Sequence, residues 1–61
     1  MKAREIIRII EQDGWYFHSQ KGSHAQYKHP VKPGRVTIPM HGSKDLSKPD
    51  IQSILKQARL K

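Results

Sequence analysis

The feature that most constrains this chain is a change in the spacing of its apolar residues at Gly14. Before Gly14, apolar residues recur every three or four positions, which predicts an amphipathic helix over 2–13. Its apolar stripe is formed by Ala3, Ile6, Ile7 and Ile10, with Ile9 beside it. Gly14 is expected to cap the helix with positive φ. After Gly14 the spacing changes to every second residue, so a strand is expected to follow the helix.

The segment 15–39 predicts three strands. In the first, over 15–19, Trp15 and Phe17 are expected to face the core, with Tyr16 and His18 on the opposite face. A turn over 20–23 follows, in which Gly22 can adopt positive φ. The second strand covers 24–29 and the third covers 35–39, separated by a type II turn at Pro33-Gly34. The inward-facing residues of these two strands are Ala25, Tyr27, Val36 and Ile38.

A second helix is predicted after a loop over 40–46. Ser47 is a typical helix-capping residue, Pro49 suits the first turn, and Asp50 completes a capping-box pattern. The apolar stripe of this helix is Ile51, Ile54, Leu55 and Ala58. The predicted fold is therefore α+β, in the order α-β-β-β-α, with both helices on one face of a three-stranded antiparallel sheet. The chain is expected to form one domain over residues 1–61.

The face of the sheet opposite the helices is predicted to be exposed and cationic. It carries hydrogen-bonding groups and one aromatic ring, in the set Tyr16, His18, His24, Gln26, Lys28, Arg35 and Thr37. Aromatic side chains can stack on bases and cations can hold phosphates, so this face is suited to RNA. The formal net charge of +7 favours a nucleic-acid partner. A basic surface that serves solubility or binds an acidic protein is the alternative.

Composition excludes several classes of protein. The chain has no cysteine, which removes disulfides and thiolate metal sites, and its four histidines are poorly spaced for zinc. No apolar run is long enough to span a membrane and no signal-peptide pattern opens the chain, so a cytoplasmic protein is expected. All five acidic residues lie in or beside the helices, which argues against two-metal nuclease chemistry. We expect neither a metal nor another cofactor.

His24 is the candidate for chemistry. RNA cleavage without a metal needs a base for the 2′-hydroxyl, an acid for the leaving 5′-oxygen and a cation for the phosphorane. Histidine suits the first two roles because it titrates near neutral pH. His24 starts a strand after the Gly22-Ser23 turn, with Lys21 before the turn and Lys28 further along the same face. The alternative is an exposed histidine without a role.

The other three histidines are weaker candidates. His41 precedes Gly42 in the loop after the third strand, where it could assist as an acid, contact phosphate, or only stabilise the loop. His29 precedes Pro30 and is expected to fix a strand end. His18 is expected to be a surface residue of the exposed face.

Several short segments, in order along nearly the whole chain, resemble the HicA toxins of bacterial toxin–antitoxin modules. They are Ile6-Ile7, Gly14-Trp15, Lys21-Gly22-Ser23-His24, Tyr27-Lys28-His29-Pro30, Val36-Thr37-Ile38-Pro39, His41-Gly42 and Ile54-Leu55-Lys56-Gln57-Ala58. Two positions depart from the pattern. Arg59 replaces a glycine that ends the last helix in many relatives, so that helix could run on, and Lys48-Pro49-Asp50 lacks another common glycine.

The resemblance implies a fold similar to double-stranded-RNA-binding domains and an mRNA interferase activity. It also implies a HicB-type antitoxin that covers the active face. The family's catalytic histidine corresponds to His24 and its tight turn to Gly22. We expect a metal-independent endoribonuclease whose RNA contacts are Lys21, Gly22, Ser23, Lys28, Arg35 and His41. The alternatives are a non-catalytic RNA- or DNA-binding module and a basic protein that only binds an acidic partner.

Overall fold

The computed structural model describes residues 1–42 and 44–61, and Ser43, within the predicted loop, lies outside the described residues. The elements are α1 (Ala3–Gln12), β1 (Tyr16–Lys21), β2 (His24–Lys28), β3 (Val36–Pro39) and α2 (Lys48–Gln57). The strands form one antiparallel sheet in the order β1-β2-β3. This arrangement confirms the α-β-β-β-α fold predicted from the apolar spacing.

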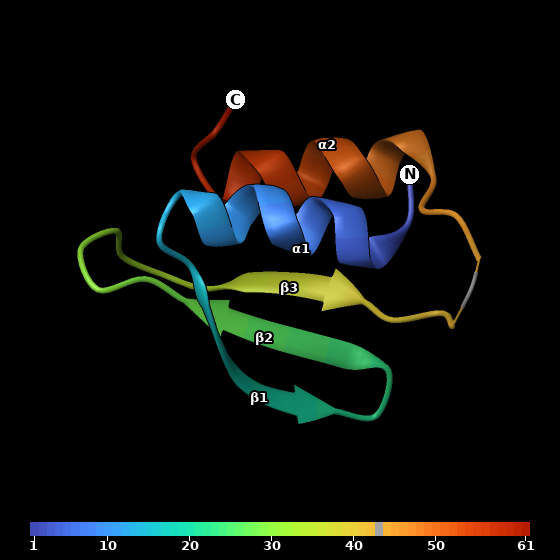
Figure 1. Ribbon diagram of the computed structural model, residues 1–61, viewed down its shortest axis with the longest axis horizontal. Helices are drawn as coiled ribbons and strands as arrows, with labels where there is room; N and C mark the ends of the chain where they lie inside the picture. The colour runs from blue at the N-terminus through green and yellow to red at the C-terminus, as the bar shows by residue number, and fades with distance from the viewer. Residues whose placement is uncertain (43) are drawn as a thin grey trace.

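Both helices pack on the same face of the sheet, and no described helix or strand crosses the other face (Figure 1). The buried cluster joins the helix stripes to the inward positions of β2 and β3. Its members are Ala3, Ile6, Ile10, Trp15, Ala25, Tyr27, Val36, Ile38, Leu46, Ile54 and Ala58. Ile7, Ile51 and Leu55 are partly buried against it, so the predicted stripes of both helices face the core. α1 and α2 run in the same direction, which puts both N-termini at the end of the molecule that holds the β1–β2 turn (Figure 1).

Phe17 is the main error in the predicted core. It pairs with Tyr27 across β1 and β2, and therefore lies on the core-facing side as expected. Its ring meets the Tyr27 ring edge-on with centroids 5.8 Å apart, yet Phe17 remains 53% exposed. β1 is an edge strand and is the strand farthest from the helices (Figure 1). Alternation gives the face of a residue, but the helices do not reach far enough across the sheet to cover this strand.

The two helices end in the same way. After α1, the N–H of Gly14 donates to the carbonyl of Glu11 and the N–H of Trp15 donates to that of Ile10. After α2, the N–H groups of Arg59 and Leu60 donate to Lys56 and Leu55 in the same pattern. Both are Schellman motifs, which require positive φ at the residue after the cap. Gly14 has φ +107°, as predicted, and Arg59 has φ +59°. The expectation that α2 could run on past Arg59 is wrong, because Arg59 takes the conformation that glycine would supply.

Side chains accept hydrogen bonds from backbone N–H groups at the start of α2 and at the outer edge of β3. Ser47 Oγ accepts a hydrogen bond from the Asp50 N–H at 3.3 Å, as the capping pattern predicts. Gln57 Oε1 accepts from the Thr37 N–H of β3 at 2.9 Å, while Gln57 Nε2 donates to Ser53. A side chain of α2 therefore occupies a backbone donor on the exposed edge of the sheet, where a strand could otherwise pair.

Neither α1 nor α2, the helices described, is long and apolar enough to cross a membrane.

Candidate nucleic-acid interface and histidine site

The β1–β2 hairpin closes through two residues, Gly22 and Ser23, and pairs Lys21 directly with His24. Gly22 has φ +55°, which is the conformation predicted for it and the one that a two-residue turn of type II′ requires at its first position. A Cβ built at Gly22 would meet nothing within 4 Å, so only the backbone conformation demands glycine here. Gln20 Nε2 donates to the Gly22 carbonyl at 3.0 Å and holds the turn. His24 and Lys21 are both exposed.

The loop that carries His41 begins beside this turn. The Met40 N–H donates to the Ser23 carbonyl at 2.5 Å, immediately after His24 pairs with Pro39 of β3. His41 follows Met40 and is exposed. We call Lys21–His24 together with Met40–Gly42 the hairpin end. The structure therefore brings the start of the His41 loop to the turn that precedes His24.

An irregularity in β1 decides which side chains share the face of His24. Phe17 pairs with Tyr27 and Ser19 pairs with Gln26, which leaves His18 as an extra residue between them. A bulge of this kind shifts the alternation by one position. Without it, Lys21 would lie on the core-facing side with Phe17; with it, Lys21 and Ser19 lie on the side opposite the helices. In a regular strand, His18 would lie on this face, as predicted from the sequence, and Ser19 would not.

The face opposite the helices, which we call the open face, is organised in three rows across the strands. The first row is Lys21, His24 and Pro39, the second is Ser19, Gln26 and Thr37, and the third is Tyr16 and Lys28. In the second row, the Thr37 hydroxyl donates to Gln26 Oε1 at 2.9 Å. Residues 16–39 contain no Asp or Glu, so the strands add no negative charge to this face.

The predicted RNA-contacting residues fall into two groups. Lys21, Gly22 and Ser23 lie with His24 at the hairpin end, which also holds the start of the His41 loop. Lys28 lies at the far end of β2, about 13 Å away at about 3.3 Å per residue. Arg35 precedes β3 at that same far end, because the next residue, Val36, pairs with Tyr27. One phosphate cannot contact both groups, whereas an extended polyanion can.

His29 is a structural residue, as its position before Pro30 predicted. Its Nδ1 accepts hydrogen bonds from the N–H groups of Val31 and Lys32 at 3.0 and 2.9 Å. Its Nε2 lies 2.7 Å from the carbonyl oxygen of Asp13 and donates to it in this tautomer. The ring also packs edge-on against Trp15, with centroids 5.1 Å apart. Both ring nitrogens are therefore committed to holding the loop after β2 against the end of α1.

Gly14 also matters for the packing of His29, which the sequence did not predict. The sequence predicted only its role as a helix cap. A Cβ at Gly14 would lie 2.7 Å from His29 Nε2. Beside it, Lys32 Nζ contacts Asp13 Oδ2 and the carbonyl of Ala58, and thereby joins the C-terminal ends of both helices. The hydrogen bond from Lys32 lowers the pKa of the Asp13 carboxyl below its ordinary value. Desolvation opposes this shift, and the charge of Lys32 adds to it.

Charges of both signs lie near the helix N-termini, beside the hairpin end. Each helix carries a partial positive charge at its N-terminus, and both N-termini lie at this end (Figure 1). Three carboxylates lie there too: Glu5 and Asp50 in the first turns of the helices, and Asp45. Asp45 Oδ1 is 3.2 Å from Lys2 Nζ, and this hydrogen bond lowers the pKa of Asp45. Among residues 1–42 and 44–61, no cluster of histidine and carboxylate groups has the arrangement of a metal site.

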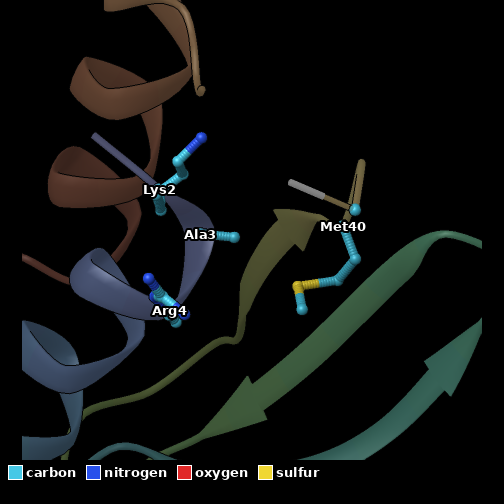
Figure 2. A pocket seen from close by; sticks show the side chains of 5 residues that line it. Lys2, Ala3, Arg4 and Met40 are labelled. Carbon is cyan, nitrogen blue, oxygen red and sulfur yellow. The ribbon is translucent and has the colours of Figure 1, made fainter. Parts of the chain in front are cut away.

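A hollow of about 150 Å³ lies between the first turn of α1 and the end of β3. Its lining residues are Lys2, Ala3, Arg4, Met40 and Gly42. Figure 2 shows the Met40 side chain opposite Ala3, with Lys2 and Arg4 on the α1 side. Met40 packs against the core, so the hollow is on the helix side of the sheet and is separate from the open face.

The fold and the open face together define a small basic α+β domain that presents a histidine and a lysine at a hairpin end. Comparison with protein families makes the assignment specific: residues 3–60 match the model of the HicA toxin of bacterial toxin–antitoxin systems. The chain belongs to the HicA toxin family, and as a member it is the toxin component of a toxin–antitoxin pair. A search of curated proteins finds no match.

Proposed function

We propose that this toxin is a metal-independent endoribonuclease that cleaves mRNA, with His24 as its general acid–base residue. The observation that carries the proposal is the pairing of an exposed His24 with Lys21 across a two-residue turn. This pairing presents an imidazole and a cation to solvent on one face, at the hairpin end. It is supported by the family to which the chain belongs.

The chemistry follows from what each group can do. Neutral His24 accepts the proton of a ribose 2′-hydroxyl while water protonates the leaving 5′-oxygen, or protonated His24 donates a proton to the leaving 5′-oxygen while water accepts the proton of the 2′-hydroxyl. The 2′-oxygen forms a bond to phosphorus as the bond to the 5′-oxygen breaks, which leaves a 2′,3′-cyclic phosphate and a new 5′-hydroxyl. The Lys21 ammonium stabilises the negative charge that develops on the phosphoryl oxygens. Gly22 keeps the backbone of the turn near the phosphate without a side chain in the way.

Lys28, Arg35 and His41 complete the proposed RNA contacts. Lys28 and Arg35 bind the RNA backbone away from the cleaved bond, and His41 contacts phosphate from the loop beside the turn.

The partner that controls the activity is a HicB-type antitoxin that covers the open face. The whole chain acts as a single domain in the cytoplasm. An acidic surface on the antitoxin would complement the charge of +7.

A non-catalytic RNA- or DNA-binding module is the second candidate. It is favoured by one observation: no described residue forms a hydrogen bond with the His24 ring, so the imidazole is not held in one orientation before substrate binds. His29, by contrast, is held at both ring nitrogens. A binding module would use the same cations and the same face without breaking a bond.

Incubation of the purified protein with end-labelled RNA in EDTA separates the two candidates. The proposal predicts cleavage that EDTA does not diminish, with products that end in 2′,3′-cyclic phosphate. Stable complexes that contain only intact RNA would support the binding module instead. A requirement for added divalent metal would contradict the mechanism.

A further inference from the structure

We infer that the open face binds single-stranded RNA along β2, and that Tyr16 stacks on a base a few nucleotides from the cleaved phosphate. The position of that phosphate at His24 rests on the proposed function. The binding track itself rests on the three rows of the open face. It makes Tyr16 a binding residue that favours unpaired bases, at the end of the sheet opposite the hairpin.

The placement of Tyr16 follows from the strand register. Tyr16 pairs with Lys28, and Lys28 lies four residues along β2 from His24 on the same face. The separation is about 13 Å at about 3.3 Å per residue, which a few nucleotides of an extended strand can span. Tyr16 is 50% exposed although it is a large aromatic side chain. A half-exposed ring beside an ammonium group can stack on a base while the cation holds the adjoining phosphate.

The middle row provides polar contacts between these two ends. The Thr37 hydroxyl donates to Gln26 Oε1 at 2.9 Å and so fixes the orientation of the Gln26 amide. The NH₂ group of that amide can then donate to a phosphate oxygen or a base acceptor. Ser19, which the bulge turns to this face, lies across from Gln26. An RNA strand along β2 would therefore meet a cation, a polar row, and then a cation with an aromatic ring.

Single-stranded RNA fits this surface better than a duplex does. A base can stack on Tyr16 only if it is unpaired and turned out of a helix, whereas a duplex presents mainly ribose and phosphate. The row order also requires an extended polyanion, because Lys21 and Lys28 lie too far apart to share one phosphate. No carboxylate in 16–39 opposes the charge of that polyanion.

The chain contains a matched control for the stacking residue. Phe17 follows Tyr16 directly and is exposed to nearly the same extent, 53% against 50%. Phe17 lies on the opposite face, because its pairing partner is the core residue Tyr27. Replacing each aromatic residue by leucine removes a similar exposed ring from one face or the other. A general effect of lost aromatic surface would appear in both variants.

The test measures binding without cleavage, in the His24→Ala background, by fluorescence anisotropy. The ligands are a labelled single-stranded RNA oligonucleotide and the same strand annealed to its complement. We expect Tyr16→Leu to weaken binding to the single strand about 5- to 150-fold, the range for the loss of one stacked base. Tyr16→Phe should retain the affinity, and Phe17→Leu should leave it unchanged. The single strand should bind more tightly than the duplex.

Three results would overturn the inference. They are unchanged affinity in Tyr16→Leu, an equal loss in Phe17→Leu, and tighter binding of the duplex. Each variant is compared at equal folded fraction, measured by circular dichroism. Because the assay needs no catalysis, its outcome is independent of the role of His24. A His24→Ala protein that still cleaves RNA would contradict the proposed function and leave the stacking result standing.

Discussion

Two histidines lie at the two ends of strand β2, and they differ in exposure and in hydrogen bonding. His24 begins the strand, is exposed, and pairs with Lys21 on the open face. His29 follows the strand, is half-buried, and uses both ring nitrogens to hold the loop and the end of α1. Four residues separate them, yet one is available to a substrate and the other is part of the fold. The difference shows that the contacts of the ring nitrogens commit His29 to the fold and leave the His24 ring exposed.

The largest expected effect is the loss of RNA cleavage when His24, the exposed histidine, is replaced. His24→Ala should reduce RNA cleavage about 10²- to 10⁴-fold, the usual contribution of a general acid–base residue. Its free energy of unfolding should stay within about 0.5 kcal/mol of the original, because an exposed side chain away from caps and cores contributes little. Single-turnover cleavage and urea unfolding measure the two quantities.

The matched variant is His29→Ala, which should lose stability and retain cleavage. It leaves two backbone donors and one carbonyl without their partner, which costs about 2–4 kcal/mol of stability. Cleavage per folded molecule should be retained. A loss of cleavage in folded His29→Ala as large as that in His24→Ala would contradict the distinction between the two.

A second comparison concerns the glycines that begin and end the β1 region. Gly14→Ala should destabilise the protein by about 2–4 kcal/mol, because an alanine at φ +107° is strained and its Cβ would lie 2.7 Å from His29 Nε2. Gly22→Ala should cost only about 1–2 kcal/mol, since φ is also positive but the space around it is open. Thermal or urea unfolding of the two variants tests this. Equal losses would mean that the contact with His29 does not matter.

A smaller effect is expected at the end of α2. Arg59→Gly should raise the free energy of unfolding by up to about 1 kcal/mol, because glycine adopts the positive φ of this position without strain. The greater flexibility of glycine in the unfolded chain limits the gain. Arg59→Ala is the control, since it removes the guanidinium and keeps the strain. A gain of the same size in Arg59→Ala would indicate a charge effect instead.

The smallest effect is a change in acid stability at the His29 site. Lys32 lowers the pKa of Asp13 in the folded protein, so the unfolded chain binds this proton at higher pH than the folded one. The stabilisation is therefore present above the ordinary carboxyl pKa, about 4, and is lost as the pH falls through the range between the ordinary and lowered values. Asp13→Asn should flatten the fall in stability over this range. An unchanged slope between pH 5 and 2 would contradict the role of the ion pair.

The sequence predicted the elements and most of the core because apolar spacing reports directly which side faces the helices. It did not predict the bulge at His18, since an extra strand residue changes no composition and alternation alone gives no sign of it. Lys21 lies on the same face as His24 only because the bulge shifts the alternation of β1 by one residue. Phe17 was placed on the correct face and wrongly buried, because burial depends on how far the helices extend across the sheet. Arg59 showed that a favourable Schellman motif can override a residue's own preference.

For the candidate site, the sequence supplied the residues of the hairpin end but not the division of the cations into two groups. Lys28 and Arg35 were predicted as RNA contacts together with the residues around His24, but the strand register places them at the opposite end of the sheet. His29 was correctly separated from the candidates on the strength of Pro30 alone. Its contact with Gly14 depends on where the chain after β2 meets the end of α1, which no local pattern reveals.

The most direct test of the central claim is chemical rescue by added imidazole. In the His24→Ala protein, an exposed site has lost its imidazole, so dissolved imidazole can take its place as acid or base. The cleavage rate of this variant should rise with imidazole concentration, while the rates of the original protein and of His29→Ala should not. A His24→Ala protein whose cleavage does not respond to imidazole, or responds no more than His29→Ala does, would contradict the assignment of His24 as the residue that moves the proton.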